Sequence, residues 1–238
     1  YKPAGTTGTF SPSDVTIGTE TMVVQAYLNL KVGDPVKFKV VNSSTGGAGT
    51  GTVPAGLTAG TEYFVKTYTA SSGAMTVSAT NGGSAVNLTD VGTAAAPNEF
   101  EVYYSDFASV GQVQSWNFEV TRSEIDVTTI GQSVGQYAPF KTYISGFADG
   151  NGSASVYVTD EDAALSNRLV EDVLQRQQVG AAFRLYQDKQ ATEALSRSIS
   201  MDAVLLSASF SVNPDDAQMV EVAFRPNNAP TFDLSTSA

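Results

Sequence analysis

The side chains of this sequence that could do chemistry are carboxylates and hydroxyls, because its 238 residues include no cysteine and no histidine. Without cysteine there are no disulfides and no thiolate nucleophiles, and without histidine the commonest general base and transition-metal ligand are missing. Zinc sites and Ser-His-Asp or Cys-His catalysis are therefore excluded. A glycosidase needs two carboxylates about 5–9 Å apart across a cleft, and no acidic residue lies in a motif that marks such a pair. We therefore expect the chain not to be an enzyme.

One stretch has the spacing of a cation site. Asp149, Asn151 and Ser153 occupy the first, third and fifth positions of a calcium-binding loop, with Asp160 at the twelfth. Such a loop needs glycine at the sixth position, where this chain has Ala154, and a bidentate glutamate at the twelfth. We therefore predict that the Asp-Gly-Asn-Gly sequence beginning at Asp149 is the turn of a β-hairpin. No metal site and no cofactor are expected.

The glycine-rich stretch at 46–51 could suggest a phosphate-binding loop. Such a loop needs a Lys-Ser or Lys-Thr pair after the glycines and a helix that opens there, and the sequence supplies neither. We interpret the stretch as a flexible connection. No apolar run has the length of a signal peptide or a membrane span, so no membrane insertion is expected.

The charge of the chain is divided unevenly between its two parts. Residues 1–97 hold five basic and five acidic side chains, whereas 98–238 hold eight basic and nineteen acidic, which accounts for the whole net charge of −11. This division suggests two units with different roles. The acidity also argues against a protein that binds duplex DNA by neutralising phosphates, because such proteins present basic surfaces.

The first part is predicted to be a small, loop-rich β module at about 27–97. The segment 36–40 alternates valine or phenylalanine with lysine, the pattern of a half-buried strand. Further strands are expected at 62–68 and 74–79, with a Ser-Ser-Gly turn between them. The Pro-Ala-Gly-Leu and Ala-Gly-Thr sequences within 53–65 resemble a short β module that recurs in phage tail and baseplate proteins.

The second part is predicted to be rich in strands, with one helix. Trp116, Phe118 and Val120 alternate with polar residues, which indicates a strand with one apolar and one polar face. A helix is expected at about 161–178, where leucines and valines form one apolar stripe and acidic residues lie at the positive end of the helix dipole.

The long strand expected at 196–213 contains an irregularity. Ile199 and Met201 place apolar residues at odd positions, whereas Leu206 and Phe210 place them at even positions. A strand with a period of two cannot accommodate this change without an extra residue. We therefore predict a β-bulge or bend near 202–203.

Residues 113–132 resemble the opening of the major tail tube proteins of tailed bacteriophages. In those proteins a strand with an aromatic residue leads into a Thr-x-x-x-Ile-Asp-x-Thr pattern. The matching residues are Thr121, Ile125, Asp126 and Thr128. The order that follows is also similar: a long loop, a hairpin, one helix, a strand that starts at a glycine, and a serine-rich strand pair. The resemblance covers about 98–226.

This resemblance implies a mainly β fold, in which a tail-tube-like two-sheet β-barrel or sandwich carries one flanking α-helix and a small inserted all-β module. The expected parts are an N-terminal arm at 1–26, the inserted module at 27–97 on the tube exterior, the tube domain at 98–226 and a C-terminal tail at 227–238.

The resemblance also implies a structural role in the tail of a virion, assembled in the cytoplasm of a bacterial host. Tail tube subunits form hexameric rings that stack around a tape-measure protein, and DNA leaves the head through the channel. Sheath, tail terminator and baseplate proteins are further expected partners, and double-stranded DNA is a passing cargo. The same architecture serves bacterial contractile injection systems.

A conduit that releases DNA quickly should not neutralise phosphates, since each lysine or arginine contact adds affinity. Like charge across a narrow lumen repels the polymer and keeps it moving. Alternation along the strands selects the candidate lumen-facing side chains. They are Glu119, Ser207, Ser209, Ser211 and Glu221. The alternative is that these side chains simply face solvent.

In tail tube proteins, the loop between the first two tube strands typically reaches a neighbouring ring. The candidate ring-stacking residues are Glu124, Ile125, Asp126, Thr128, Tyr137 and Phe140. A second function class stays open: a carbohydrate- or receptor-binding β module of a phage fibre, a baseplate or a bacterial surface protein. For that class the tyrosines could form a sugar-binding shelf, although aromatic residues at strand spacing usually lie in a core or an interface. The tyrosines concerned are Tyr63, Tyr68, Tyr103 and Tyr104.

Overall fold

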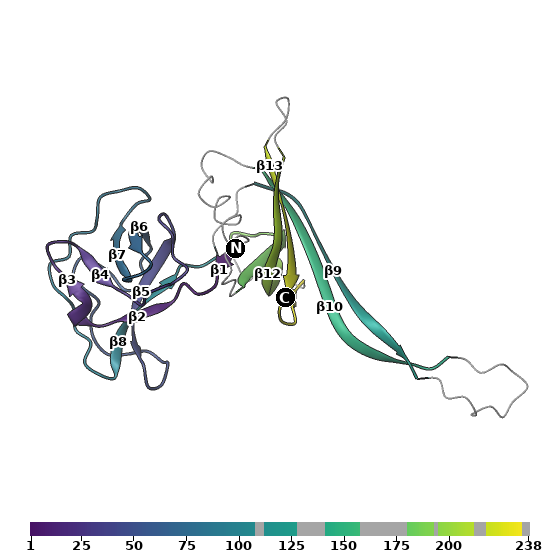
Figure 1. The fold of residues 1–238 in the computed structure, drawn as a ribbon, viewed down its shortest axis with the longest axis horizontal. Helices are drawn as coiled ribbons and strands as arrows, with labels where there is room; N and C mark the ends of the chain where they lie inside the picture. The colour runs from purple at the N-terminus through teal and green to yellow at the C-terminus, as the bar shows by residue number, and fades with distance from the viewer. Residues whose placement is uncertain (108–111, 128–140, 158–179, 193–194, 212–217, 235–238) are drawn as a thin grey trace, which may run out of the picture. The chain divides into compact units, whose positions relative to one another are not determined.

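The computed structural model describes residues 1–107, 112–127, 141–157, 180–192, 195–211 and 218–234. The chain divides into two compact units, one of Tyr1–Ser109 with Val179–Arg184 and one of Val110–Gln178 with Leu185–Ala238. The predicted mainly β fold is confirmed, because the described residues form two antiparallel sheets (Figure 1). The strand order of each sheet is open, so the described residues form no closed barrel.

The sheet of the first unit has the strand order β2-β8-β5-β6-β7-β4-β3. Its strands are β2 (Gly8–Phe10), β3 (Val15–Thr16), β4 (Thr21–Val23), β5 (Pro35–Asn42), β6 (Tyr63–Thr69), β7 (Ala74–Ser78) and β8 (Asn98–Tyr104), and the 3₁₀ helix η1 (Pro12–Asp14) precedes β3. The three strands expected from alternation are present as β5, β6 and β7.

The core of the first unit follows from the alternation that the sequence shows. Along β5, Val36 and Phe38 are fully buried, and the ring of Phe38 packs against that of Phe10 with centroids 6.2 Å apart. The lysines between them lie on the other face, where Lys37 and Lys39 pair with Asp106 and Glu101. One face of this sheet is therefore a hydrophobic core and the other is solvated.

The sheet of the first unit extends beyond the boundaries drawn at 27 and 97. β2, β3 and β4 precede residue 27, and β8 follows residue 97. β8 pairs with β5 along its whole length, from Asn42 opposite Asn98 to Val36 opposite Tyr104. Short strands of two or three residues carry too little alternation for their pairing to be recognised in the sequence. The segment at 1–26 therefore contributes strands to the module sheet.

The second sheet has the strand order β1-β11-β12-β13-β10-β9, and β14 also pairs with β12. Its strands are β1 (Lys2–Pro3), β9 (Gln112–Asp126), β10 (Tyr143–Tyr157), β11 (Ala181–Asp188), β12 (Arg197–Ser211), β13 (Met219–Pro226) and β14 (Thr231–Asp233). β14 lies in the segment at 227–238 that was expected to be a tail. The helix expected at 161–178 lies outside the described residues.

The predicted hairpin turn at Asp149 is wrong, because 149–152 lie inside the continuous strand β10. β9 offers a partner along this whole length, with Thr121 opposite Asp149. The two glycines serve close packing instead of a turn. A Cβ on Gly150 would lie 2.8 Å from Cγ of Pro226, and a Cβ on Gly152 would collide with the Phe224 ring.

The predicted irregularity in β12 exists, three residues further along than expected. The pairing of β12 with β13 shifts between Leu205 and Ser207, so Leu206 is the extra residue and is exposed. The switch of apolar residues from odd to even positions is thus explained. The buried Ala203 continues the odd series, which is why the bulge lies after it. As to membranes, none of the helices that the structure describes is long and apolar enough for a span.

Candidate functional site

The strands β12, β13, β10 and β9 form a four-stranded antiparallel region with two chemically different faces. Side chains opposite each other in an antiparallel ladder share a face, and successive side chains alternate. Following the register across the strands gives a face of hydroxyl, amide and carboxylate groups, here called the serine face. Its residues are Ser115, Asn117 and Glu119 on β9, Asn151, Ser153 and Ser155 on β10, Glu221 and Arg225 on β13, and Ser207, Ser209 and Ser211 on β12.

The structure places all five candidate lumen residues on the serine face. Ser209 lies opposite Glu221, and Glu119 lies opposite Asn151 two rows away. Ser207 and Ser211 flank Ser209 along β12 on the same side. That this face lines a lumen stays a prediction.

The sequence analysis missed the serine-face residues of β10. Ser155 lies between Glu221 of β13 and Ser115 of β9, and Ser153 occupies the equivalent position one row along. The assumed turn at 149–152 concealed them, because it ended the strand where the alternation of Asn151, Ser153 and Ser155 begins. This alternation was the available signal.

The opposite face, here called the core face, carries the apolar side chains. Val220, Val222 and Phe224 alternate along β13 and are all buried. On β9, the indole N–H of Trp116 donates to the backbone oxygen of Tyr186 on β11, at 3.1 Å. A half-buried indole with its N–H satisfied is a packing element, so this face holds the sheet together and leaves the serine face available.

The charge of the serine face is small. Glu119 and Glu221 are its acidic groups within the four-stranded region, and Arg225 pairs with Asp149 at 3.2 Å, with both side chains more than half exposed. Asp149 also accepts a hydrogen bond from the Gly150 N–H, so its contacts here are an arginine and a backbone amide. A surface of hydroxyls and a few carboxylates hydrogen-bonds water but has little to neutralise phosphates.

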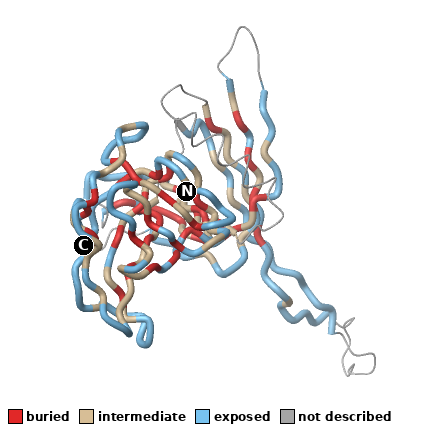
Figure 2. The backbone as a smooth tube through the Cα atoms, turned by 60° about the vertical axis from the view of Figure 1, so that its left-hand side comes forward, coloured by how far each residue is buried: buried red, intermediate tan, exposed pale blue. Residues whose placement is uncertain are grey.

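Beyond the four-stranded region, β9 and β10 continue as a two-stranded ribbon, here called the arm (121–127 and 142–149). The pairing of β10 with β13 reaches only to Gly152, whereas its pairing with β9 runs on to Tyr143 opposite Asp126. The arm is exposed along nearly its whole length (Figure 2). Three candidate stacking residues lie on it: Glu124, Ile125 and Asp126. The other three, Thr128, Tyr137 and Phe140, lie outside the described residues.

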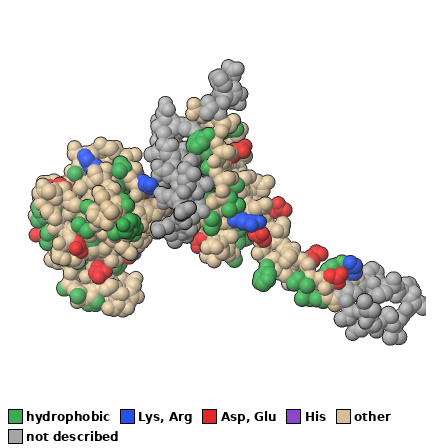
Figure 3. All heavy atoms as spheres, in the orientation of Figure 1, with side chains coloured by type: hydrophobic (Ala, Val, Ile, Leu, Met, Phe, Trp, Pro, Cys, Tyr) green, Lys and Arg blue, Asp and Glu red, His purple; other side chains and the backbone are tan. Residues whose placement is uncertain are grey.

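The two faces of the sheet exchange their polarity at the arm. The continuation of the serine face carries Ile125 opposite Ile144, followed by Val127. The continuation of the core face carries Arg122, Glu124 and Asp126, and Asp126 pairs with Lys141 at 3.4 Å. Hydrophobic and charged side chains lie along the arm in Figure 3. The apolar side of the arm, here called the apolar arm face, therefore points away from the protein's own core.

A β-bulge on β10 lies within the apolar arm face. Two residues, Gly146 and Phe147, stand opposite Ser123, because the register shifts between Ser145 and Ala148. The Ser123 hydroxyl donates to the backbone oxygen of Phe147 at 3.3 Å, and Gly146 leaves room for that hydroxyl. Bulges redirect side chains. The Phe147 side chain is 90% exposed, the largest exposure among the protein's exposed large hydrophobic residues in the described part.

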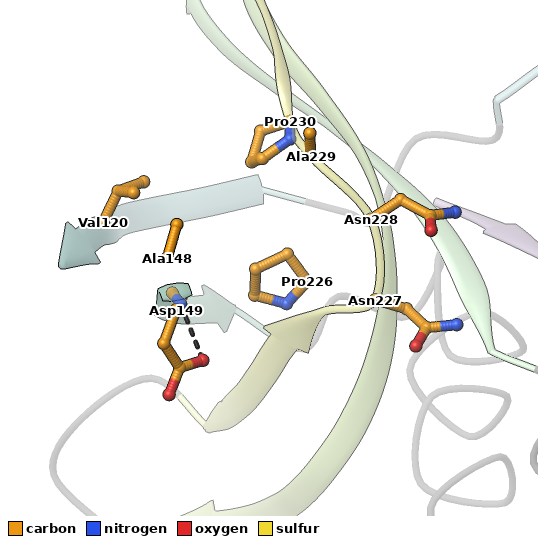
Figure 4. A pocket seen from close by; sticks show the side chains of 9 residues that line it. Val120, Ala148, Asp149, Pro226, Asn227, Asn228, Ala229 and Pro230 are labelled. Carbon is orange, nitrogen blue, oxygen red and sulfur yellow. Dashed lines mark hydrogen bonds between the residues drawn. The ribbon is translucent and has the colours of Figure 1, made fainter. Parts of the chain in front are cut away.

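The core face has a hollow at the root of the arm. Its volume is about 290 Å³. The lining is mainly apolar and comes from β9, β10 and the segment after β13 (Figure 4). The lining residues are Val120, Ala148, Asp149, Gly150, Pro226, Asn227, Asn228, Ala229 and Pro230. A hydrogen bond from the Asn227 N–H to the Asp202 oxygen, at 2.7 Å, ties this segment to β12.

The tyrosines proposed as a sugar-binding shelf do not form one surface. Tyr63 and Tyr104 are buried in the first unit. Tyr68 accepts a hydrogen bond from the Leu28 N–H at 2.8 Å, and its partial burial raises the pKa of its hydroxyl. Tyr103 lies under the Lys39 ammonium, 4.9 Å from the ring centroid. These side chains act in packing and local ordering.

The comparisons with known proteins are few. No family description matches the sequence, and no curated protein matches it. Two solved structures are similar to part of the chain. One is a chain of the tail of an empty gene transfer agent particle with C6 symmetry (12% identity, TM-score 0.39, 54% of this chain and 87% of that chain). The other is a chain of the virion of a native gene transfer agent particle (13%, 0.40, 53% and 88%). Likenesses at these TM-scores decide neither fold nor function.

Proposed function

We propose that this chain is a structural, non-enzymatic subunit of a phage tail tube, which assembles into hexameric rings that stack to form a conduit for DNA ejection. The observation that carries the proposal is the serine face. Four neighbouring strands present hydroxyls, amides and two carboxylates on one side and a buried apolar core on the other. A channel wall needs this combination, because it must stay wet and must not bind phosphates.

The edge of the second sheet supports the self-assembly part of the proposal. β9 is a fifteen-residue strand at the end of the strand order, so one side of it has no sheet neighbour among the described strands. Long unpaired edges are templates for pairing with another chain. Pairing of this edge with a neighbouring copy would extend the serine face from one subunit to the next.

The arm supports stacking. An isolated two-stranded hairpin is marginally stable in water, yet the arm extends well past the four-stranded region and exposes several apolar side chains. Burial of these side chains against another copy would stabilise the arm. The sequence resemblance at Thr121, Ile125 and Asp126 falls in this same segment. We assign the first unit, whose net charge is near zero, to the exterior of the tube.

Electron microscopy of the purified full chain tests the proposal. Negative staining should show rings or tubes about 10 nm wide, the size expected for six subunits of this mass. A map of the tubes should place Ser209 and Glu221 on the inner wall. Finding both side chains on the outer wall would contradict the assignment. A monomer or trimer that binds glycans would instead favour the carbohydrate- or receptor-binding class.

A further inference from the structure

We propose that Phe147 of one copy inserts into the hollow at the arm root of a second copy, so that copies of this chain join head to tail through the two faces of one hairpin. This inference rests on the proposed self-assembly and names the contact that carries it. The donor is the apolar arm face, and the acceptor is the core-face hollow lined by Val120, Ala148, Pro226 and Ala229.

The donor side chain is held in position. The Phe147 ring is 90% exposed, and its backbone is fixed by the β-bulge and by the Ser123 hydroxyl. A large rigid aromatic side chain on an ordered backbone loses little conformational entropy on binding, which is why aromatic residues anchor interfaces. Ile125 and Ile144 flank it on the same face. Phe147 is therefore an anchor residue without an aromatic partner in its own arm.

The acceptor has the right size and chemistry for an aromatic ring. A cavity of about 150 Å³ can hold benzene, and the hollow measures about 290 Å³. Val120 is half exposed although it lies on the core face, and Pro226 and Ala229 form the opposite wall. An entering ring would cover apolar surface that the protein's own fold leaves exposed.

Phe147 cannot fill the hollow of its own chain. The hollow lies on the core face, as Gly150 and Ala148 do, whereas the bulge opposite Ser123 places Phe147 on the continuation of the serine face. A knob and a hole on opposite faces of one element make a heterologous contact, in which each copy uses a different surface toward each neighbour. Such contacts generate rings or open filaments, not two-fold dimers.

Charge favours the apolar arm face as the contact between copies. Each copy carries a net charge of −11, so two copies repel each other. From Ser123 to Val127 and from Thr142 to Phe147, the side chains on the apolar arm face include no ionisable group. The acids of the arm, Glu124 and Asp126, lie on its other side. Two acidic copies can therefore approach through this face without bringing carboxylates together.

The area is consistent with a repeated contact. The exposed side chains of the apolar arm face amount to roughly 400 Å² of apolar surface, at the ordinary size of aromatic and aliphatic side chains. A standard interface buries about 800 Å² per partner. The apolar arm face therefore supplies about half of what one stable contact needs, and β9 edge pairing can supply the remainder.

Disulfide trapping in the full chain tests the inference, because the sequence contains no cysteine that could interfere. Phe147→Cys and Ala229→Cys are made separately, and both positions are exposed, so neither change removes core packing. After mixing, assembly and mild oxidation, we expect a covalent dimer that neither variant forms alone. The matched control mixes Phe147→Cys with Ser209→Cys, and we expect at least tenfold less dimer.

Microscopy of the same samples separates this inference from the proposed function. Tubes without the Phe147–Ala229 cross-link overturn the inference and leave the tube proposal intact. A Phe147→Cys sample that cross-links equally well by itself indicates a two-fold contact and also overturns it. If the unmodified chain forms no rings or tubes, the tube proposal fails and the inference fails with it. Phe147→Ser should in addition reduce assembly at least tenfold while leaving the Trp116 emission of the monomer unchanged.

Discussion

Ser209 on β12 lies directly opposite Glu221 on β13, so a hydroxyl and a carboxylate stand side by side on the serine face. Their Cβ atoms are about 5 Å apart in such a ladder pair. Ser155 on β10 flanks the same glutamate from the other side. Each carboxylate of this face is thus surrounded by neutral polar groups, which keeps its charge dilute and its surroundings hydrated.

Ser209→Lys should convert a wall that releases DNA into one that retains it. Each new lysine–phosphate contact adds counterion-release affinity, which falls about 3.5-fold between 50 and 200 mM salt. Assembled tubes of the variant should retain duplex DNA at low salt and release it as salt rises, and a filter-binding titration measures this. Ser71→Lys, with the same change of charge at an exposed turn of the first unit, is the control. Equal retention by both variants would mean that the serine face is not the wall that DNA meets.

Gly152→Ala should destabilise the second unit by about 1–3 kcal/mol, the usual cost of overpacking. The added methyl group would collide with the Phe224 ring, which is fully buried and cannot move away. Urea unfolding followed by the fluorescence of Trp116 reports on this unit alone, because Trp116 is the single tryptophan. Ser153→Ala, the adjacent position on the serine face, should change stability by less than about 0.5 kcal/mol. Equal effects of the two changes would contradict the close packing described here.

Tyr68→Phe should destabilise the first unit by about 1–2 kcal/mol at neutral pH, because the Leu28 N–H loses its acceptor. The change should also reduce the alkaline sensitivity of that unit. Partial burial raises the pKa of Tyr68 above its ordinary value of 10.0. The stability that its neutral form provides is therefore complete below about pH 10, and is lost as the pH rises through the folded-state pKa. Circular dichroism melts between pH 8 and 11.5 should show a steeper decline for the natural chain than for the variant.

Removal of the first module should succeed only when whole strands are removed. Deletion of 27–97 takes away β5, β6 and β7 and leaves β8 without its partner β5, so this variant should aggregate. Deletion of 8–104 with a flexible linker in its place removes the complete sheet and should leave a soluble second unit. Size-exclusion chromatography and microscopy compare the two. If the second variant is soluble but forms no rings, the first unit contributes to the ring and is not a decoration.

Alternation allowed the sequence to predict the long strands and the serine face. Side chains on successive residues of a strand point to opposite sides regardless of what lies around them, so Ser207, Ser209 and Ser211 could be grouped without a structure. The same rule showed that β12 contains an extra residue. Its position was placed near 202–203 instead of at Leu206, because a change of phase in the pattern bounds a bulge only to within a few residues.

The features that escaped prediction depend on contacts between distant segments. Asp-Gly-Asn-Gly favours a turn locally, and only the approach of Phe224 and Pro226 from β13 explains why glycines stand inside a continuous strand. The strands before residue 27 are too short to carry a period, and they are recognised by their partners β7 and β8. The hollow at the arm root likewise combines residues some 80 to 110 positions apart in the chain.

The hairpin carries two bulges on different strands, and together they keep its two ends aligned. Gln114 is the extra residue of β9, and β10 has its own extra residue at 146–147. Each strand therefore spans fifteen residues, and Gln112 still faces Tyr157 at one end while Asp126 faces Tyr143 at the other. A single-residue deletion between the bulges would turn every later side chain of that strand to the opposite side. Variation in the length of this hairpin should thus come in pairs of residues, or fall at the bulges themselves.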